Sequence, residues 1–222
     1  IKIDWSKSME KNPPFTLEDW KSIVFYLRTW VKKTTNAKGN QIKNPFYRLV
    51  FAEYLKVMAN SGCRPHELLR MKWSDIELRS KMEISSSNPN KKRERIIAHM
   101  NVPDDTKTGR RLVICPAGTY LKRLHRLYRD KEGSSPKPND YIVRNVGTVH
   151  SKKDLHYGNA LNDSFLRTMW YSLKEDLTRD KDLIFSNNYT LYSCRSFFIN
   201  QRLEMGVPPA IVAELVGHSI KT

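Results

Sequence analysis

The spacing of apolar residues predicts helices over most of the chain. The first covers residues 16–33, where Thr16 stands at the expected N-terminal cap and apolar side chains recur every three or four positions. A second helix begins at about Phe46 and ends at Gly62, a residue type that suits the end of a helix. The same reasoning predicts helices at residues 65–71, 117–131, 159–179, 190–206 and 208–217.

The middle of the chain has a different pattern, with short segments rich in β-prone residues. Residues 75–85, 94–102 and 110–116 predict three strands, and the turn-rich residues 103–109 join the last two. The run NPNKKRER, residues 88–95, is polar and basic, and we expect it to be a mobile loop. The fold class predicted for residues 1–222 is α+β, as one mostly α-helical domain with a small three-stranded antiparallel sheet.

Charge narrows the choice of partner. The 222 residues include 39 Lys and Arg against 23 Asp and Glu, a formal net charge of +16. Such an excess favours a polyanion, most commonly a nucleic acid, over an anionic membrane surface. No apolar run is long enough to span a bilayer, and residues 1–11 lack the apolar stretch of a signal peptide. Cys63, Cys115 and Cys194 form no close pair and indicate free thiols, so we expect a cytoplasmic protein with no membrane partner.

Two stretches combine arginines with apolar residues. GCRPHELLRMKWSDI, residues 62–76, places Arg64 and Glu67 just after a predicted helix end. The stretch from Cys194 to the end of the sequence contains Arg195 and the pair Gly217–His218. An arginine is always charged, and its planar fork can bind two oxygen atoms at once. An arginine among apolar residues must have a partner that offsets its removal from water.

This pattern resembles the catalytic domain of the tyrosine recombinases, the integrases of phages and mobile elements. The first stretch matches their G-x-R-x-x-E-L-x-x-L-x-W-x-D-I box, with Met71 where leucine is common. The second matches their second arginine box as far as the L-G-H-S motif, with Val216 before the glycine. Lys107 lies in a predicted hairpin between the two boxes. The resemblance extends over nearly the whole chain.

The resemblance implies a role for each residue of the boxes. Arg64 and Arg195 would clamp the scissile phosphate, and Lys107 would protonate the departing 5′ oxygen. His218 would hydrogen-bond a phosphate oxygen, and Glu67 would orient Arg64. Three of these residues also have a simpler interpretation taken alone: Arg64 in a surface ion pair, Lys107 as a solvated turn lysine, and His218 as a helix cap.

Two departures from the family pattern concern tyrosines. Tyr192 stands where the family usually has histidine, three residues before the second arginine. A tyrosine is a poor base at neutral pH, so we expect Tyr192 to position a group by hydrogen bonding, or to pack as a half-buried helix residue. The family's nucleophilic tyrosine follows its Gly-His pair by about nine residues. We therefore expect the nucleophile beyond Thr222, and likewise expect the family's N-terminal DNA-clamping domain outside these residues.

Other polar residues carry weaker signals. Lys122, Arg126 and Arg129 share one face of a predicted helix, which is either a DNA-binding surface or a solvated face. Asp104 and Asp105 are interpreted as turn residues rather than ligands of a metal-dependent nuclease. The other histidines have no metal-ligand spacing, so we expect neither a metal nor another cofactor. They are His66, His99, His125, His150 and His156.

The sequence therefore predicts site-specific DNA recombination, in which strands are cut and rejoined through a 3′-phosphotyrosyl link without metal or ATP. The expected partners are duplex DNA attachment sites and three further copies of the protein, as a homotetramer on DNA. Two alternatives remain open. One is a type IB topoisomerase-like enzyme, and the other is a DNA-binding regulatory module with a degenerate site, which Tyr192 and the missing nucleophile favour.

Overall fold

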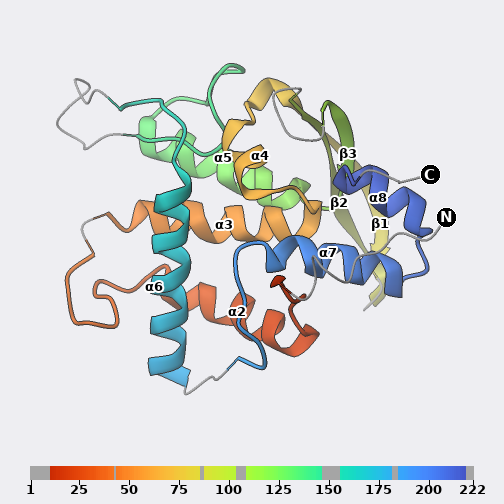
Figure 1. Ribbon diagram of the computed structural model, residues 1–222. Helices are drawn as coiled ribbons and strands as arrows, with labels where there is room; N and C mark the ends of the chain where they lie inside the picture. The colour runs from red at the N-terminus through yellow and green to blue at the C-terminus, as the bar shows by residue number, and fades with distance from the viewer. Residues whose placement is uncertain are drawn as a thin grey trace.

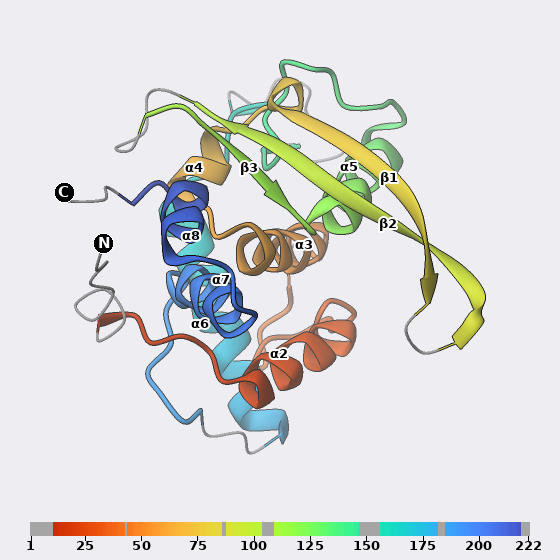
Figure 2. The same cartoon turned by 90° about the vertical axis from the view of Figure 1, so that its right-hand side faces the viewer.

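The computed structural model describes residues 11–42, 44–85, 88–103, 109–146, 156–181 and 185–218. Helix α3 runs through the middle of the molecule, with α2, α5, α6 and α7 against it and a sheet packed on both α3 and α5 (Figures 1 and 2). This arrangement confirms the predicted α+β class. The helices are α2 (Leu17–Trp30), α3 (Phe46–Ser61), α4 (Pro65–Arg70), α5 (Gly118–Glu132), α6 (Asp163–Lys181), α7 (Ser193–Glu204) and α8 (Pro209–Val216), with a 3-10 turn, η1 (Trp73–Asp75).

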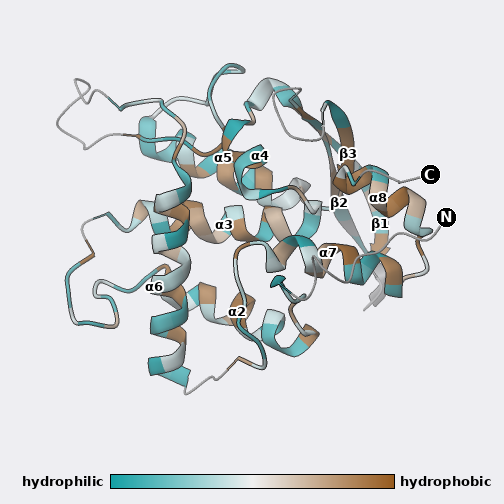
Figure 3. Ribbon diagram, in the orientation of Figure 1, coloured by the Kyte–Doolittle hydropathy of each residue, from teal (hydrophilic) through white to brown (hydrophobic). Residues whose placement is uncertain are grey.

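The ends of two helices follow the expected capping chemistry. Thr16 precedes α2, and its hydroxyl oxygen accepts a hydrogen bond from the backbone N–H of Asp19 at 3.0 Å. Gly62 ends α3 with φ at +67°, a left-handed conformation that strains other residues. Apolar residues cover much of α3 and α8, whereas the outer face of α6 is hydrophilic (Figure 3). None of the helices described is long and apolar enough to cross a membrane.

The sheet consists of β1 (Ile76–Ser85), β2 (Asn88–Val102) and β3 (Arg111–Cys115), antiparallel and in the order β1-β2-β3. Its inner face carries the buried Ala98, Met100 and Val113, which join the helical core beneath (Figure 2). The prediction of a loop at residues 88–95 was wrong, because β2 begins at Asn88, and Asn88 and residues 92–95 pair with β1. Strand pairing uses backbone groups, so a polar run can take part in it.

The start of α6 also differs from the prediction, which placed it at residue 159. Ala160 instead forms an isolated bridge with Arg144, and the helix begins at Asp163. The side-chain oxygen of Asn162 accepts a hydrogen bond from the backbone N–H of Phe165 at 2.8 Å. Asn162 therefore acts as the N-terminal cap and fixes where the helix starts.

A buried ion pair, together with a hydrogen bond from a tryptophan, joins three helices. Arg48 of α3 lies 2.9 Å from Asp176 of α6, and the two side chains are 4% and 0% exposed. The indole N–H of Trp30 on α2 donates to the same carboxylate at 2.8 Å, and the Arg48 guanidinium lies 4.3 Å from the centre of the indole ring. This network holds α2 and α6 against α3, whose C-terminal end carries the site described next.

Candidate active site

The first arginine of the site stands between α3 and α4. Arg64 has an extended backbone immediately before Pro65, the first residue of α4. Glu67, one turn later, accepts the backbone N–H of Arg64 at 2.8 Å with one carboxylate oxygen and an Arg64 guanidinium N–H at 2.8 Å with the other. The carboxylate thus fixes both the backbone and the side chain of Arg64, as the sequence predicted for Glu67.

The same carboxylate binds a second arginine, which the sequence analysis did not identify. Arg111, the first residue of β3, donates two guanidinium N–H groups to the two oxygens of Glu67, at 3.0 and 2.7 Å. Glu67 is fully buried, and this two-pronged pairing is the arrangement in which arginine binds a carboxylate most strongly. The only signal in the sequence is the Arg110–Arg111 pair at the start of a predicted strand.

These contacts change the acidity of Glu67. Burial alone would raise its pKa, because the charged carboxylate is removed from water. Hydrogen bonds from Arg111 and Arg64 outweigh that effect and lower the pKa of Glu67 from 4.5 to about 2. Glu67 therefore stays ionised and holds the two arginines at any physiological pH.

Arg195 of α7 approaches the same place from another direction. It donates to the carbonyl oxygen of Gly62 at 2.8 Å and to that of Val216 at 2.5 Å. Its side chain is buried, and this burial, together with repulsion from Arg64, lowers its pKa to about 10. The guanidinium is thus a charge removed from water and placed close to another positive charge.

The C-terminal end of α8 completes the cluster. Its carbonyl groups at Leu215 and Val216 accept hydrogen bonds from Arg111, at 3.1 Å, and from Arg195. Cations are favoured at this end of a helix because the last carbonyls have no partner within the helix. Gly217 then takes a left-handed conformation, and the backbone N–H of His218 donates to Ala213 at 2.8 Å. His218 therefore caps α8 through its backbone. Its side chain is half-buried, and in the chain it comes soon after Leu215 and Val216, whose carbonyl groups bind the arginines.

Three arginines converge on one buried carboxylate. Arg64, Arg111 and Arg195 come from three different elements, and Glu67 is the carboxylate that their hydrogen bonds and charges share. Guanidinium groups gathered in this way suit an anion with several oxygens, such as a phosphodiester, because each can bind two oxygen atoms at once.

Comparison with solved structures places this arrangement among known folds. The XerH site-specific recombinase, in a pre-cleavage complex with its difH substrate, aligns with 94% of the chain at a TM-score of 0.59 and 15% identity. The Tn1549 transposon integrase in complex with transposon right end DNA aligns with 94% at a TM-score of 0.59 and 12% identity. The XerA recombinase aligns with 94% at a TM-score of 0.54 and 19% identity. The chain shares the fold of these recombinases.

The match covers about half of each neighbour: 48% of the XerH chain, 58% of the Tn1549 integrase chain and 56% of the XerA chain. No family model and no curated protein sequence matches the chain. At these identities the comparison establishes the recombinase fold, and the chemistry has to be argued from the side chains of the site.

Within the recombinase fold, the other predicted site residues lie as follows. Tyr192 immediately precedes α7, and its side chain is 38% exposed, so it faces solvent near the helix that carries Arg195. Lys107, Asp104 and Asp105 lie outside the described residues. The strands that flank Lys107 in sequence do reach the cluster, because Arg111 pairs with Val102 at their ends.

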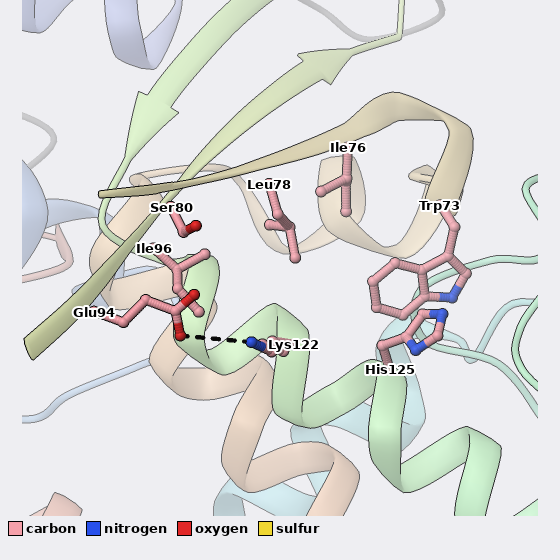
Figure 4. A pocket seen from close by; sticks show the side chains of 8 residues that line it. All are labelled: Trp73, Ile76, Leu78, Ser80, Glu94, Ile96, Lys122 and His125. Carbon is pink, nitrogen blue, oxygen red and sulfur yellow. Dashed lines mark ion pairs between the residues drawn. The ribbon is translucent and has the colours of Figure 1, made fainter. Parts of the chain in front are cut away.

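The basic stripe on α5 pairs with other carboxylates than the arginine cluster does. Lys122, Arg126 and Arg129 are all exposed. Lys122 lies 3.6 Å from Glu94 of β2, at the edge of a pocket of about 430 Å³ between α5 and β1 that Trp73 and His125 also line (Figure 4). Arg129 pairs with its neighbour Asp130 at 2.9 Å.

Histidine, cysteine, aspartate and glutamate side chains are the residues that could supply ligands to a metal ion. Over the part of the chain that the structure describes, there is no group of three or more His, Cys, Asp or Glu residues placed to hold a metal ion. His150 lies outside that part. The three cysteines are free and buried, and burial raises the pKa of Cys63 to about 11.

Gly62 ends α3, and its carbonyl oxygen accepts a hydrogen bond from Arg195. We predict that Gly62→Ala lowers the free energy of unfolding by about 2 kcal/mol. A Cβ atom there would lie 2.4 Å from Cδ1 of Phe198 in addition to the strain of its positive φ. Gly39→Ala is the matched control, since Gly39 also has a positive φ, of +78°, but its Cβ would meet nothing within 4 Å. Urea unfolding should show a loss of about 1 kcal/mol for the control. Equal losses would contradict the proposed clash.

Proposed function

We propose that the chain is the catalytic domain of a site-specific tyrosine recombinase, which cuts and rejoins duplex DNA through a 3′-phosphotyrosyl link. The observation that supports this most directly is the convergence of three arginines from different elements on one buried glutamate. A phosphodiester carries negative charge and several acceptor oxygens, which guanidinium groups bind in pairs. The recombinase fold, found in structures that contain DNA, is consistent with that substrate.

In the proposed reaction, a tyrosine located beyond Thr222 in the full-length protein attacks the scissile phosphorus. A bond forms between its oxygen and phosphorus, and the bond from phosphorus to the 5′ oxygen breaks. Lys107 gives a proton to that oxygen, while Arg64 and Arg195 stabilise charge on the non-bridging oxygens. His218 donates a hydrogen bond to the phosphate, and Tyr192 positions a neighbouring group. The tyrosine loses one proton and the 5′ oxygen gains one. Because one phosphoester bond replaces another, the bond energy is conserved and no ATP is required, and the arginines supply the positive charge without a metal.

The proposed partners follow from this reaction. The protein acts on duplex attachment sites, and four copies assemble on two duplexes, so that the 5′ hydroxyl of one strand attacks the phosphotyrosyl link of another. The stripe of Lys122, Arg126 and Arg129 contacts the backbone phosphates of the duplex. The proposed location is the cytoplasm.

The assignment of Lys107 gives a sharp prediction. Lys107→Ala in the full-length protein should slow cleavage of a duplex site by about 10²–10⁴-fold, the usual contribution of a general acid. A substrate with sulfur in place of the 5′ bridging oxygen should restore the rate, because a thiolate leaves without being protonated. Cleavage is followed as covalent protein–DNA complex on denaturing gels, with the site first mapped using the wild-type protein.

Arg64→Ala is the comparison variant in that assay, because sulfur substitution does not replace charge stabilisation, so its rate should stay low on both substrates. If the sulfur-containing substrate does not restore the cleavage rate of Lys107→Ala, Lys107 is not the general acid that protonates the 5′ oxygen. Absence of any covalent complex with the wild-type full-length protein, despite duplex binding, would instead favour the regulatory DNA-binding alternative. Relaxation of supercoiled DNA without exchange between two sites would indicate the topoisomerase-like alternative.

A further inference from the structure

A groove opens beside the arginine cluster, between α6 and the residues that lead into α7. Its volume is about 680 Å³, and Pro65 and Tyr192 are among the residues that line it. Pro65 directly follows Arg64, and Tyr192 immediately precedes the helix that carries Arg195. The chain before α7 runs alongside α6 (Figure 1), and the indole N–H of Trp170 joins the two by donating to the carbonyl of Tyr189 at 3.2 Å.

Aromatic rings form the walls of this groove. Tyr171 of α6 is 60% exposed and Tyr192 is 38% exposed, while Trp170 lies buried beneath them. Exposed aromatic rings on both sides of one groove are typical of surfaces on which nucleic acid bases stack. Stacking requires a base whose face is accessible, and in a duplex both faces are covered by the neighbouring base pairs.

The groove is also basic. Among the described residues that line it are Lys11, Arg167 and Lys174 and one carboxylate, that of Asp163, which pairs with Arg167 at 2.6 Å. The Lys174 ammonium lies 5.5 Å from the centre of the Tyr171 ring, so charge and aromatic surface occur together. This combination of cations and stacking surfaces is how proteins bind single strands without reading their sequence.

We propose that this groove binds unpaired nucleotides of the DNA strand next to the scissile phosphate, with bases stacked on Tyr171 and Tyr192 and phosphates near Lys11 and Lys174. The inference rests on the proposed function, since exchange of strands requires nucleotides next to the cut to leave their complement. The groove holds those nucleotides unpaired beside the arginines, and thereby favours the separated state of the strand.

The test uses the 222-residue chain and two probes, a short single-stranded oligonucleotide that contains 2-aminopurine and the same sequence as a duplex. Tyr171→Ala should weaken binding of the single strand about tenfold, the loss of one stacked base, and should reduce the quenching of 2-aminopurine. Binding of the duplex should change less than twofold. Tyr171→Phe, which keeps the ring and removes only the hydroxyl, should bind both probes as the wild type does.

Phe25→Ala is the matched control, because Phe25 is 62% exposed on α2 and does not line this groove. It should leave both affinities unchanged. Equal weakening of single strand and duplex by Tyr171→Ala, or no weakening of either, would overturn the inference. That result is distinct from failure of the proposed function, which is read from covalent complex formation by the full-length protein and does not depend on Tyr171.

Discussion

Replacing Arg64 by alanine is expected to slow DNA cleavage by the full-length protein about 10³-fold, while most duplex binding remains. A charged donor aimed at the developing charge of a transition state typically contributes 10²–10³-fold, and a guanidinium in a water-poor site belongs at the upper end. Arg64 meets that description, since its side chain is 16% exposed and Glu67 holds it in place. Binding persists because duplex affinity depends on many separate phosphate contacts.

Two further variants show whether the loss comes from Arg64 itself. Arg64→Lys keeps the charge but loses the planar fork, so it should recover only part of the rate. Arg70→Ala removes an exposed arginine from the same short helix and should leave cleavage within about twofold. Single-turnover cleavage and fluorescence anisotropy on the same duplex measure rate and affinity separately. A parallel fall of rate and affinity for Arg64→Ala would mean that Arg64 serves binding rather than the transition state.

Local rules predicted much of the fold and part of the site. Thr16, Gly62 and Pro65 mark helix ends by their own backbone and capping preferences, so their positions could be inferred without knowing the tertiary structure. The resemblance to the recombinase box assigned Glu67 to Arg64, one helical turn away. The two residues are hydrogen-bonded in the structure.

The remaining features depend on contacts between residues far apart in the sequence. Arg111 reaches Glu67 only because β3 lies beside α4, across 44 positions of the chain. No local pattern distinguishes it from Arg110. The extension of β2 to Asn88 likewise depends on its partner β1, since the polar side chains of that run carry no strand periodicity.

The start of α6, by contrast, could have been predicted from the sequence, because an asparagine immediately before Asp163 is a common N-terminal cap.

Glu67 connects the two arginines, and replacing it by glutamine should lower the free energy of unfolding by about 4 kcal/mol at pH 7. Removing one partner of a buried ion pair typically costs about 3–5 kcal/mol, because the other charge remains buried without compensation. Here two arginines lose their counter-charge, with a third close by. Glutamine keeps the size and one acceptor oxygen, so the change tests charge rather than packing.

The pH dependence identifies the carboxylate as the cause. The pKa of Glu67 is lowered from 4.5 to about 2 in the folded state, so its stabilisation is complete above pH 4.5 and is lost as the pH falls towards 2. This difference corresponds to about 3 kcal/mol, of which about 2 kcal/mol should be lost by pH 3. Urea unfolding from pH 7 to pH 3 should therefore show the gap between wild type and Glu67→Gln narrowing over that range.

Glu214→Gln is the control for this series, because Glu214 is an exposed carboxylate on α8. Its stability should follow the wild type within about 0.5 kcal/mol at every pH. A constant gap between wild type and Glu67→Gln from pH 7 to pH 3 would mean that the loss reflects packing, and that Glu67 is not the ionised centre of the cluster. A narrowing gap would instead show that the stability of the fold depends on the negative charge of Glu67, which holds Arg64 and Arg111 in place.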